Sequence, residues 1–142
     1  MAGALDRFSG RVATGYIVQA RAGDGVTMKN GLFSVHIHML DGVRGRDSGV
    51  TILRDGHLIS GGPHFWSVGS YTAGQGTWKG HFSTNQHTPF GDPSVRSVLR
   101  GQEATSGFSG TYTEDGAEIF GTTLSGGRSL SFHATLKRLA DL

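Results

Sequence analysis

Seven histidines are the side chains of this sequence most suited to binding a metal or transferring a proton at neutral pH. His36 and His38 are two residues apart, so in a β-strand they would project from the same face. With a third ligand, such a pair could hold Zn²⁺ at about 2.0–2.1 Å. No acidic residue lies in the same run, and the chain contains no Cys. We therefore interpret both as histidines on the solvent side of a strand and predict no metal site.

The other histidines occur singly, and none has the spacing of a recognisable ligand set. They are His57, His64, His81, His87 and His133. The sequence contains no Gly-x-Ser-x-Gly nucleophile turn, no His-Glu-x-x-His motif and no phosphate-binding loop. Glu114, Asp115 and Glu118 cluster around one expected turn and are most simply solvated. The sequence thus favours a protein that is not an enzyme and that carries no cofactor.

The composition limits the class of protein. A chain of 142 residues is the size of one domain, and its 24 Gly argue against long helices. No apolar stretch approaches the roughly 20 residues of a membrane span, and no basic cap precedes an apolar core at the N-terminus. We therefore expect a cytoplasmic protein that does not contact a membrane.

The distribution of charge argues against direct binding to nucleic acid. The net charge of +2 arises within residues 1–30, and the rest of the chain has nine basic and nine acidic side chains. A nucleic-acid-binding protein usually carries a clustered basic face. Only Arg44 and Arg46 lie close together, and Asp41 and Asp47 flank them.

β-Strands would position the histidines and the other polar side chains. The clearest strand runs from Arg128 to Arg138. Its apolar and polar residues alternate strictly, which predicts a strand with one buried face and one solvated face. The buried face would carry Leu130, Phe132, Ala134 and Leu136. The run from Leu32 to Leu40 alternates in the same way, with Phe33, Val35, Ile37 and Met39 on its apolar face.

Turn signals recur about every ten residues between such runs. Arg54-Asp55-Gly56 and Glu114-Asp115-Gly116 each place Asp-Gly between two runs, which is a type I′ hairpin signal. Further strands are expected at 49–53, 57–60, 65–73, 77–83, 94–100, 107–113 and 118–124. Thr84–Pro93 is the longest loop signal and a candidate lid or binding loop. The pattern predicts an all-β fold, a single up-and-down antiparallel β-barrel of about eight strands.

The barrel is expected to span 28–142, because residues 1–27 show neither a hairpin partner nor a sustained helical period. We expect 1–27 to be a flexible N-terminal extension. One hypothesis is that Met28 is the natural start of the protein. The alternative is a loosely packed arm or a helix that covers one barrel mouth.

Eight strands enclose an interior that side chains fill or that holds one small ligand. If the interior is hollow, an apolar ligand would occupy a cavity of a few hundred Å³. Its candidate lining residues are Phe33, Val35, Ile37, Met39, Phe132 and Leu136.

The hairpin formed by 65–73 and 77–83 is rich in aromatic residues and has apolar side chains on both faces. Trp66, Val68 and Trp78 are its candidate surface for a dimer or another partner. A second copy of the chain is the simplest partner, because apolar residues on both faces indicate burial on both sides.

Several short Gly-centred motifs of the chain resemble those of a known family. The first is Met28-Lys29-Asn30-Gly31-Leu32-Phe33-Ser34-Val35, which is similar to the opening of the GrlR-like negative regulators of type III secretion. The similarity continues through Asp55-Gly56, Ile59-Ser60-Gly61-Gly62 and Ser67-Val68-Gly69-Ser70-Tyr71 and covers about 28–138. The resemblance implies a lipocalin-like (calycin-type) small barrel that forms homodimers. It also implies repression by sequestering a transcriptional activator, without contact to DNA.

One departure from that family concerns its partner surface. The founding members carry an acidic Glu-Asp-Glu-Asp patch after the strand that ends near Tyr71, whereas this chain has no acidic residue in 72–77. Those binding residues are therefore not transferred to this chain. Two functions remain open, a dimeric regulator that binds an activator and a barrel that binds a small apolar molecule.

Overall fold

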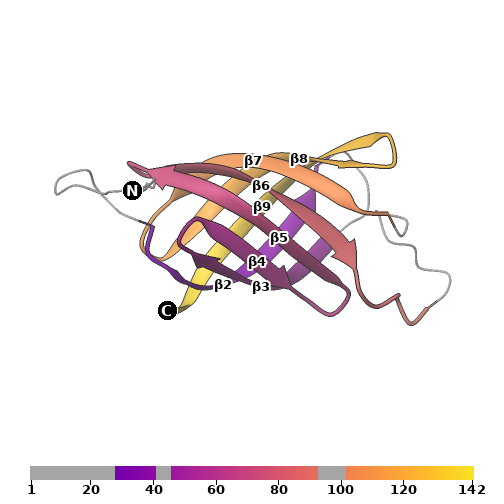
Figure 1. Ribbon diagram of the computed structural model, residues 1–142, viewed down its shortest axis with the longest axis horizontal. Helices are drawn as coiled ribbons and strands as arrows, with labels where there is room; N and C mark the ends of the chain where they lie inside the picture. Colours follow the sequence, from indigo (N-terminus) through magenta and orange to yellow (C-terminus); the bar gives the residue numbers. More distant parts are fainter. Residues whose placement is uncertain (1–27, 41–45, 93–101) are drawn as a thin grey trace. The chain divides into compact units, whose positions relative to one another are not determined.

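The computed structural model describes residues 28–40, 46–92 and 102–142, and within them the chain forms strands and no helix (Figure 1). The strands are β2 (Gly31–Met39), β3 (Arg46–Arg54), β4 (His57–Gly61), β5 (Phe65–Gly74), β6 (Thr77–Gln86), β7 (Ala104–Tyr112), β8 (Gly116–Ser125) and β9 (Arg128–Asp141). None of the described residues belongs to a helix long and apolar enough to cross a bilayer.

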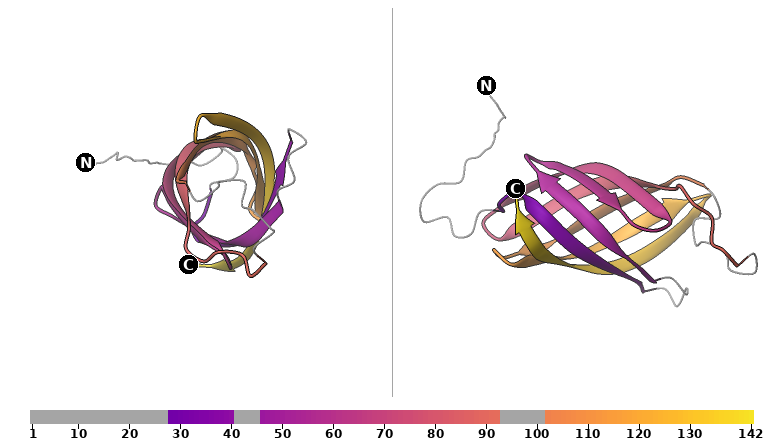
Figure 2. Two further views of the ribbon diagram at one scale, coloured as in Figure 1. Left: turned by 90° about the vertical axis from the view of Figure 1, so that its right-hand side faces the viewer. Right: turned by 90° about the horizontal axis from the view of Figure 1, so that it is seen from below.

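The strands form one closed antiparallel barrel in which each strand pairs with its neighbours in the sequence. The first and last described strands close the ring, with Val35 opposite Leu136 and Ile37 opposite Ala134. An end-on view shows the strands following one another around this ring (Figure 2). The expected fold class, a single up-and-down barrel of about eight strands, is confirmed.

Some strand bounds differ from the expected ones. β6 continues to Gln86, into the segment expected to be a loop, and β7 begins at Ala104 instead of Gly107. The reason is the β6–β7 pairing, which runs from Thr77 opposite Thr111 to Thr84 opposite Ala104 and satisfies backbone groups along that whole length. The expected strand 94–100 and the extension 1–27 lie outside the described residues.

The turn between β3 and β4 has the expected chemistry. Asp55 and Gly56 have φ of 52° and 84°, as a type I′ turn requires. Asn30 supports this turn from the start of β2, because its amide donates to Asp55 Oδ1 at 3.0 Å and its Oδ1 accepts from Asp55 N–H at 2.9 Å. The Asp115-Gly116 turn joins β7 and β8 differently, since neither residue has a positive φ.

The core lies in the barrel interior and contains many aromatic rings. Trp78 packs edge-on against Phe108 with ring centroids 4.8 Å apart and against Tyr71 at 5.7 Å. Phe82 extends this cluster to Phe132 at 6.2 Å. Because these rings fill much of the barrel cross-section, only part of the interior remains open.

Candidate functional site

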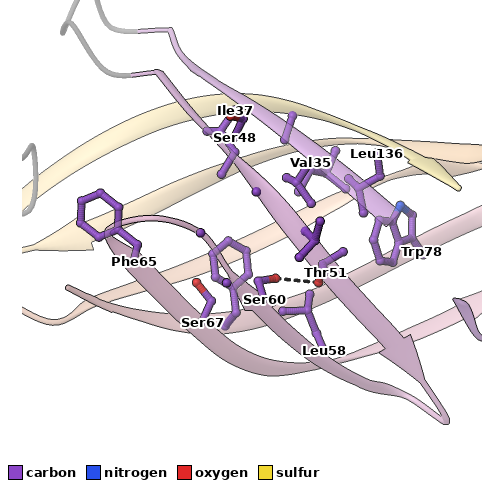
Figure 3. Close-up of a pocket in the computed structure, with 17 residues that line it drawn as sticks. Val35, Ile37, Ser48, Thr51, Leu58, Ser60, Phe65, Ser67, Trp78 and Leu136 are labelled. Carbon is purple, nitrogen blue, oxygen red and sulfur yellow. Dashed lines mark hydrogen bonds between the residues drawn. The ribbon is translucent and has the colours of Figure 1, made fainter. Parts of the chain in front are cut away.

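The barrel interior contains a cavity of about 70 Å³, which Figure 3 shows in close-up. Its lining comes from β2, β3, β4, β5, β6, β8 and β9 and includes Val35, Ile37, Thr51, Leu58, Ser60, Phe65, Ser67, Trp78, Phe82, Ile119, Ala134 and Leu136. Ser48 and Val50, which are exposed on the outer side of β3, also contribute to the lining.

The structure brings three of the expected lining residues to this cavity. Val35, Ile37 and Leu136 line it. Phe33 and Phe132 do not line it; they are 1% and 2% exposed and belong to the packed core. Met39 packs against that core without lining the cavity.

The cavity is also much smaller than the few hundred Å³ that the sequence suggested. A cavity of about 150 Å³ holds benzene, so about 70 Å³ suits only a few heavy atoms or the end of a longer molecule. Trp78 and Phe82 explain the smaller volume, because both side chains project inward and occupy part of the barrel interior.

One wall of the cavity is polar. Thr51, Ser60 and Ser67 lie on adjacent strands and face one another directly in the register, and all three line the cavity. Ser60 donates to Thr51 Oγ1 at 2.6 Å, and Thr51 donates to the Ile59 carbonyl at 3.3 Å. Ser67 shares a hydrogen bond of 2.7 Å with Thr84. Sequence reasoning missed this wall, although the alternation around Leu58 and Phe65 would have placed both serines on the inner face.

The described lining contains no Asp, Glu, Lys, Arg or His. A charged ligand group would therefore lose its hydration without gaining an ion pair, which is costly in an enclosed site. Tyr71 packs against the core, and burial raises its pKa to about 12. Its phenol is therefore neutral at physiological pH.

The segment after β6 lies against the rim of the cavity. Gly62 and Phe65 line the cavity, and His87 Nε2 donates to the Gly62 carbonyl at 2.8 Å. His64 Nδ1 donates to the Thr88 carbonyl at 3.1 Å, and its ring packs edge-on against Phe90 at 4.5 Å. These contacts hold part of the expected binding loop beside Gly62 of the cavity lining, a placement that the sequence pattern did not reveal.

The outer surface of β3, β4 and β5 is unusually apolar. Ile59 lies between Ile52 and Val68 in the register, and Gly61 lies between Val50 and Trp66. Ile59 is 55% exposed and Trp66 is 42% exposed. We call Val50, Ile52, Ile59, Trp66 and Val68 the outer apolar face.

Of the three candidate partner-surface residues, Trp66 and Val68 are exposed, and the placement of Trp78 on that surface is wrong. Trp78 is only 3% exposed and belongs to the core. The physical reason is the alternation of β6, in which Trp78, Gly80 and Phe82 face inward while Lys79 and His81 face outward.

The histidines lie on the outside of the barrel. His36 and His38 are exposed, and His38 is opposite His133 in the β2–β9 pairing. His133 donates from Nε2 to Glu118 at 2.7 Å and stacks on Phe120 with ring centroids 4.5 Å apart. Within the residues that the structure describes, no group of three or more His, Asp or Glu side chains is arranged to hold a metal ion.

No model of a known protein family matches the chain, and no curated protein sequence matches it.

Proposed function

We propose that this chain is a non-enzymatic regulatory binding protein, a cytoplasmic homodimer that represses type III secretion by sequestering a transcriptional activator. The observation that carries the proposal is the outer apolar face. Five apolar side chains occupy neighbouring positions on three adjacent strands, and solvent reaches all of them. Contiguous apolar surface on a folded domain is characteristic of a protein–protein contact.

The short motifs shared with GrlR-like regulators support the activator as the regulated partner. Because the chain lacks the acidic residues of that family in 72–77, the activator would contact a different surface. The outer apolar face is the surface we assign to the homodimer contact.

Gly61 offers a direct test of this face. It lies between Val50 and Trp66, and a Cβ placed on it would meet no atom within 4 Å. Gly61→Arg should therefore leave the barrel intact and place a charge in the dimer contact. Gly107→Arg is the matched control, because a Cβ at Gly107 also meets nothing within 4 Å and the residue lies on β7.

The measurement is sedimentation equilibrium of the wild type and both variants. We expect the wild type and Gly107→Arg to be dimers and Gly61→Arg to be a monomer with unchanged circular dichroism. A monomeric wild type, or a Gly61→Arg dimer of unchanged affinity, would contradict the assigned interface.

Sequestration requires a separate experiment. The tagged protein is used to capture its partner from host lysate, and the captured regulator is then tested for DNA binding by gel shift. We expect added wild-type protein to release that regulator from DNA in a dose-dependent way. A regulator that stays on its DNA at saturating protein would overturn the sequestration mechanism.

The cavity supports a second function, the binding of a small molecule. Val50 belongs to both the cavity lining and the outer apolar face, and Gly61, its partner in the register, also lines the cavity, so a ligand could bias partner binding. Native mass spectrometry of the protein purified without detergent should reveal an adduct of constant mass. If the purified protein carries no adduct and also binds no small molecule that is added to it, this second function is contradicted.

A further inference from the structure

We infer that the cavity selects a neutral ligand with a hydroxyl group on a short aliphatic chain. This inference rests on the second function above, small-molecule binding, and adds the chemical class of the ligand. Its basis is the division of the cavity into two unlike walls. Val35, Ile37 and Leu136, from β2 and β9, form an aliphatic wall, and Thr51, Ser60 and Ser67, from β3, β4 and β5, form a hydroxyl wall (Figure 3).

The hydrogen bonds of the hydroxyl wall determine what it can offer to a ligand. A serine hydroxyl has one proton to donate and two lone pairs that accept. Ser60 uses its proton on Thr51, so the Ser60 oxygen keeps accepting capacity toward the cavity. Ser67 and Thr84 together have two protons, and the single bond between them uses one. When Thr84 donates, the Ser67 proton is free to point into the cavity.

With Thr84 as the donor in that bond, the wall presents an acceptor at Ser60 and a donor at Ser67, on residues directly opposite each other in the β4–β5 pairing. An alcohol is the simple group that matches both, because its hydroxyl donates to one oxygen and accepts from the other. An ether or a ketone can accept only, so it would leave Ser60 without a donor. A carboxylate or an ammonium group would enter a site whose described lining has no opposite charge.

The size of the cavity sets the length of the ligand. A cavity of about 150 Å³ holds the six heavy atoms of benzene. In proportion, the volume of about 70 Å³ accepts roughly three heavy atoms. 1-Propanol, with four heavy atoms, is at the upper limit of this size; its hydroxyl would meet the serines while its carbons contact the aliphatic wall. For a ligand of four heavy atoms we expect a Kd on the order of 1 mM.

The test is an NMR titration of the full-length protein that follows the indole N–H signals of its two tryptophans. Trp78 lines the cavity and reports on it, whereas Trp66 lies on the outer face and serves as an internal control. The probes are 1-propanol, ethyl methyl ether, sodium propionate and xenon. We expect 1-propanol to shift the Trp78 signal saturably and to bind about fivefold more tightly than the ether. Propionate should produce no saturable shift.

Three serine variants separate the hydroxyl wall from the cavity as a whole. Ser60→Ala and Ser67→Ala should each weaken 1-propanol about fivefold and leave xenon binding within about twofold of the wild type. Ser109→Ala on the exposed side of β7 is the control and should change neither. Circular dichroism and thermal midpoints establish that each variant is folded.

The outcomes distinguish this inference from the function on which it rests. If xenon binds and 1-propanol is no better than the ether, the cavity binds small molecules and the alcohol preference is wrong. An affinity for 1-propanol unchanged in both Ser60→Ala and Ser67→Ala would also overturn the preference. If no probe shifts Trp78, both the ligand class and small-molecule binding in this cavity are wrong.

Discussion

The guanidinium of Arg138 lies over the ring of Phe33, with Cζ 4.7 Å from the ring centroid. Its nitrogens donate to three carbonyls, those of Asn30 at 3.0 Å, Lys29 at 2.9 Å and Glu114 at 2.7 Å. One side chain from β9 thus joins the start of β2 and the turn between β7 and β8. Arg138 thus links segments that are far apart in the sequence.

We predict that Arg138→Met destabilises the protein by about 3 kcal/mol, because three carbonyls lose a charged donor and the ring loses its cation. Urea denaturation of both proteins measures the difference. Arg54→Met is the matched control, because the Arg54 side chain is 70% exposed and its ion pair is long, with Nε 4.0 Å from Asp55 Oδ2. We expect that substitution to cost less than about 0.5 kcal/mol. Equal losses in the two variants would contradict the role assigned to Arg138.

Two glycines on neighbouring strands should respond oppositely to alanine. A Cβ at Gly80 would collide with the Ser70 carbonyl and lie 2.9 Å from Phe108 Cζ, whereas a Cβ at Gly107 meets nothing within 4 Å. We predict that Gly80→Ala costs about 2 kcal/mol or more through overpacking, while Gly107→Ala is neutral or stabilises by about 0.5 kcal/mol. The urea concentrations at which the two variants and the wild type are half unfolded measure these stability changes. A stable Gly80→Ala protein would show that β5 and β6 are less tightly apposed than described.

The closing strand illustrates what the sequence can predict. Strict alternation placed Leu130, Phe132, Ala134 and Leu136 on one face, and all four are buried. The Asp55-Gly56 turn was equally predictable from the sequence, because few residue pairs accept two successive positive φ angles. Both signals are local, so a single sequence is sufficient to detect them.

The cavity and its polar wall depend on contacts that no local pattern encodes. Its volume is set by how far Trp78 and Phe82 extend across the barrel, which requires the packing of several strands. The hydroxyl wall requires the register that places Ser60 opposite Ser67. The error at Trp78 is different, because the alternation with Gly80 and Phe82 would have placed it inside. The abundance of aromatic residues in that hairpin favoured a surface interpretation instead.

A buried pair of hydroxyls offers a thermodynamic test of the interior. Ser106 and Thr123 are opposite each other on β7 and β8, are 4% and 8% exposed, and share a hydrogen bond of 2.8 Å. We predict that Ser106→Ala and Thr123→Val each cost about 1–2 kcal/mol, because each leaves one buried hydroxyl without its partner. The double variant should cost less than the sum of the two, with a coupling of about 1 kcal/mol. If urea denaturation shows that the double variant loses as much unfolding free energy as the two single variants combined, the hydrogen bond between Ser106 and Thr123 is contradicted.

The neutral phenol of Tyr71 predicts how stability depends on pH. Burial, the largest cause, raises its pKa from 10.0 to about 12, so the folded state holds this proton more tightly than the unfolded state. Between pH 10 and 12 the unfolded chain binds fewer protons at this site, and stability falls as pH rises. The expected slope is about 1.4 kcal/mol per pH unit, whereas below pH 10 this group contributes no pH dependence.

We therefore expect wild-type stability to decrease between pH 10 and 12 more steeply than that of Tyr71→Phe, which has no phenol to ionise at this position. Urea denaturation at pH 9, 10, 11 and 12 measures both curves, and the difference between them isolates Tyr71 from the lysines that titrate in the same range. Ultraviolet absorbance near 295 nm should show one tyrosine ionising about two units late, and this late step should vanish in the variant. Parallel stability curves for the two proteins would mean that water reaches the phenol and that this end of the barrel is not closed around it.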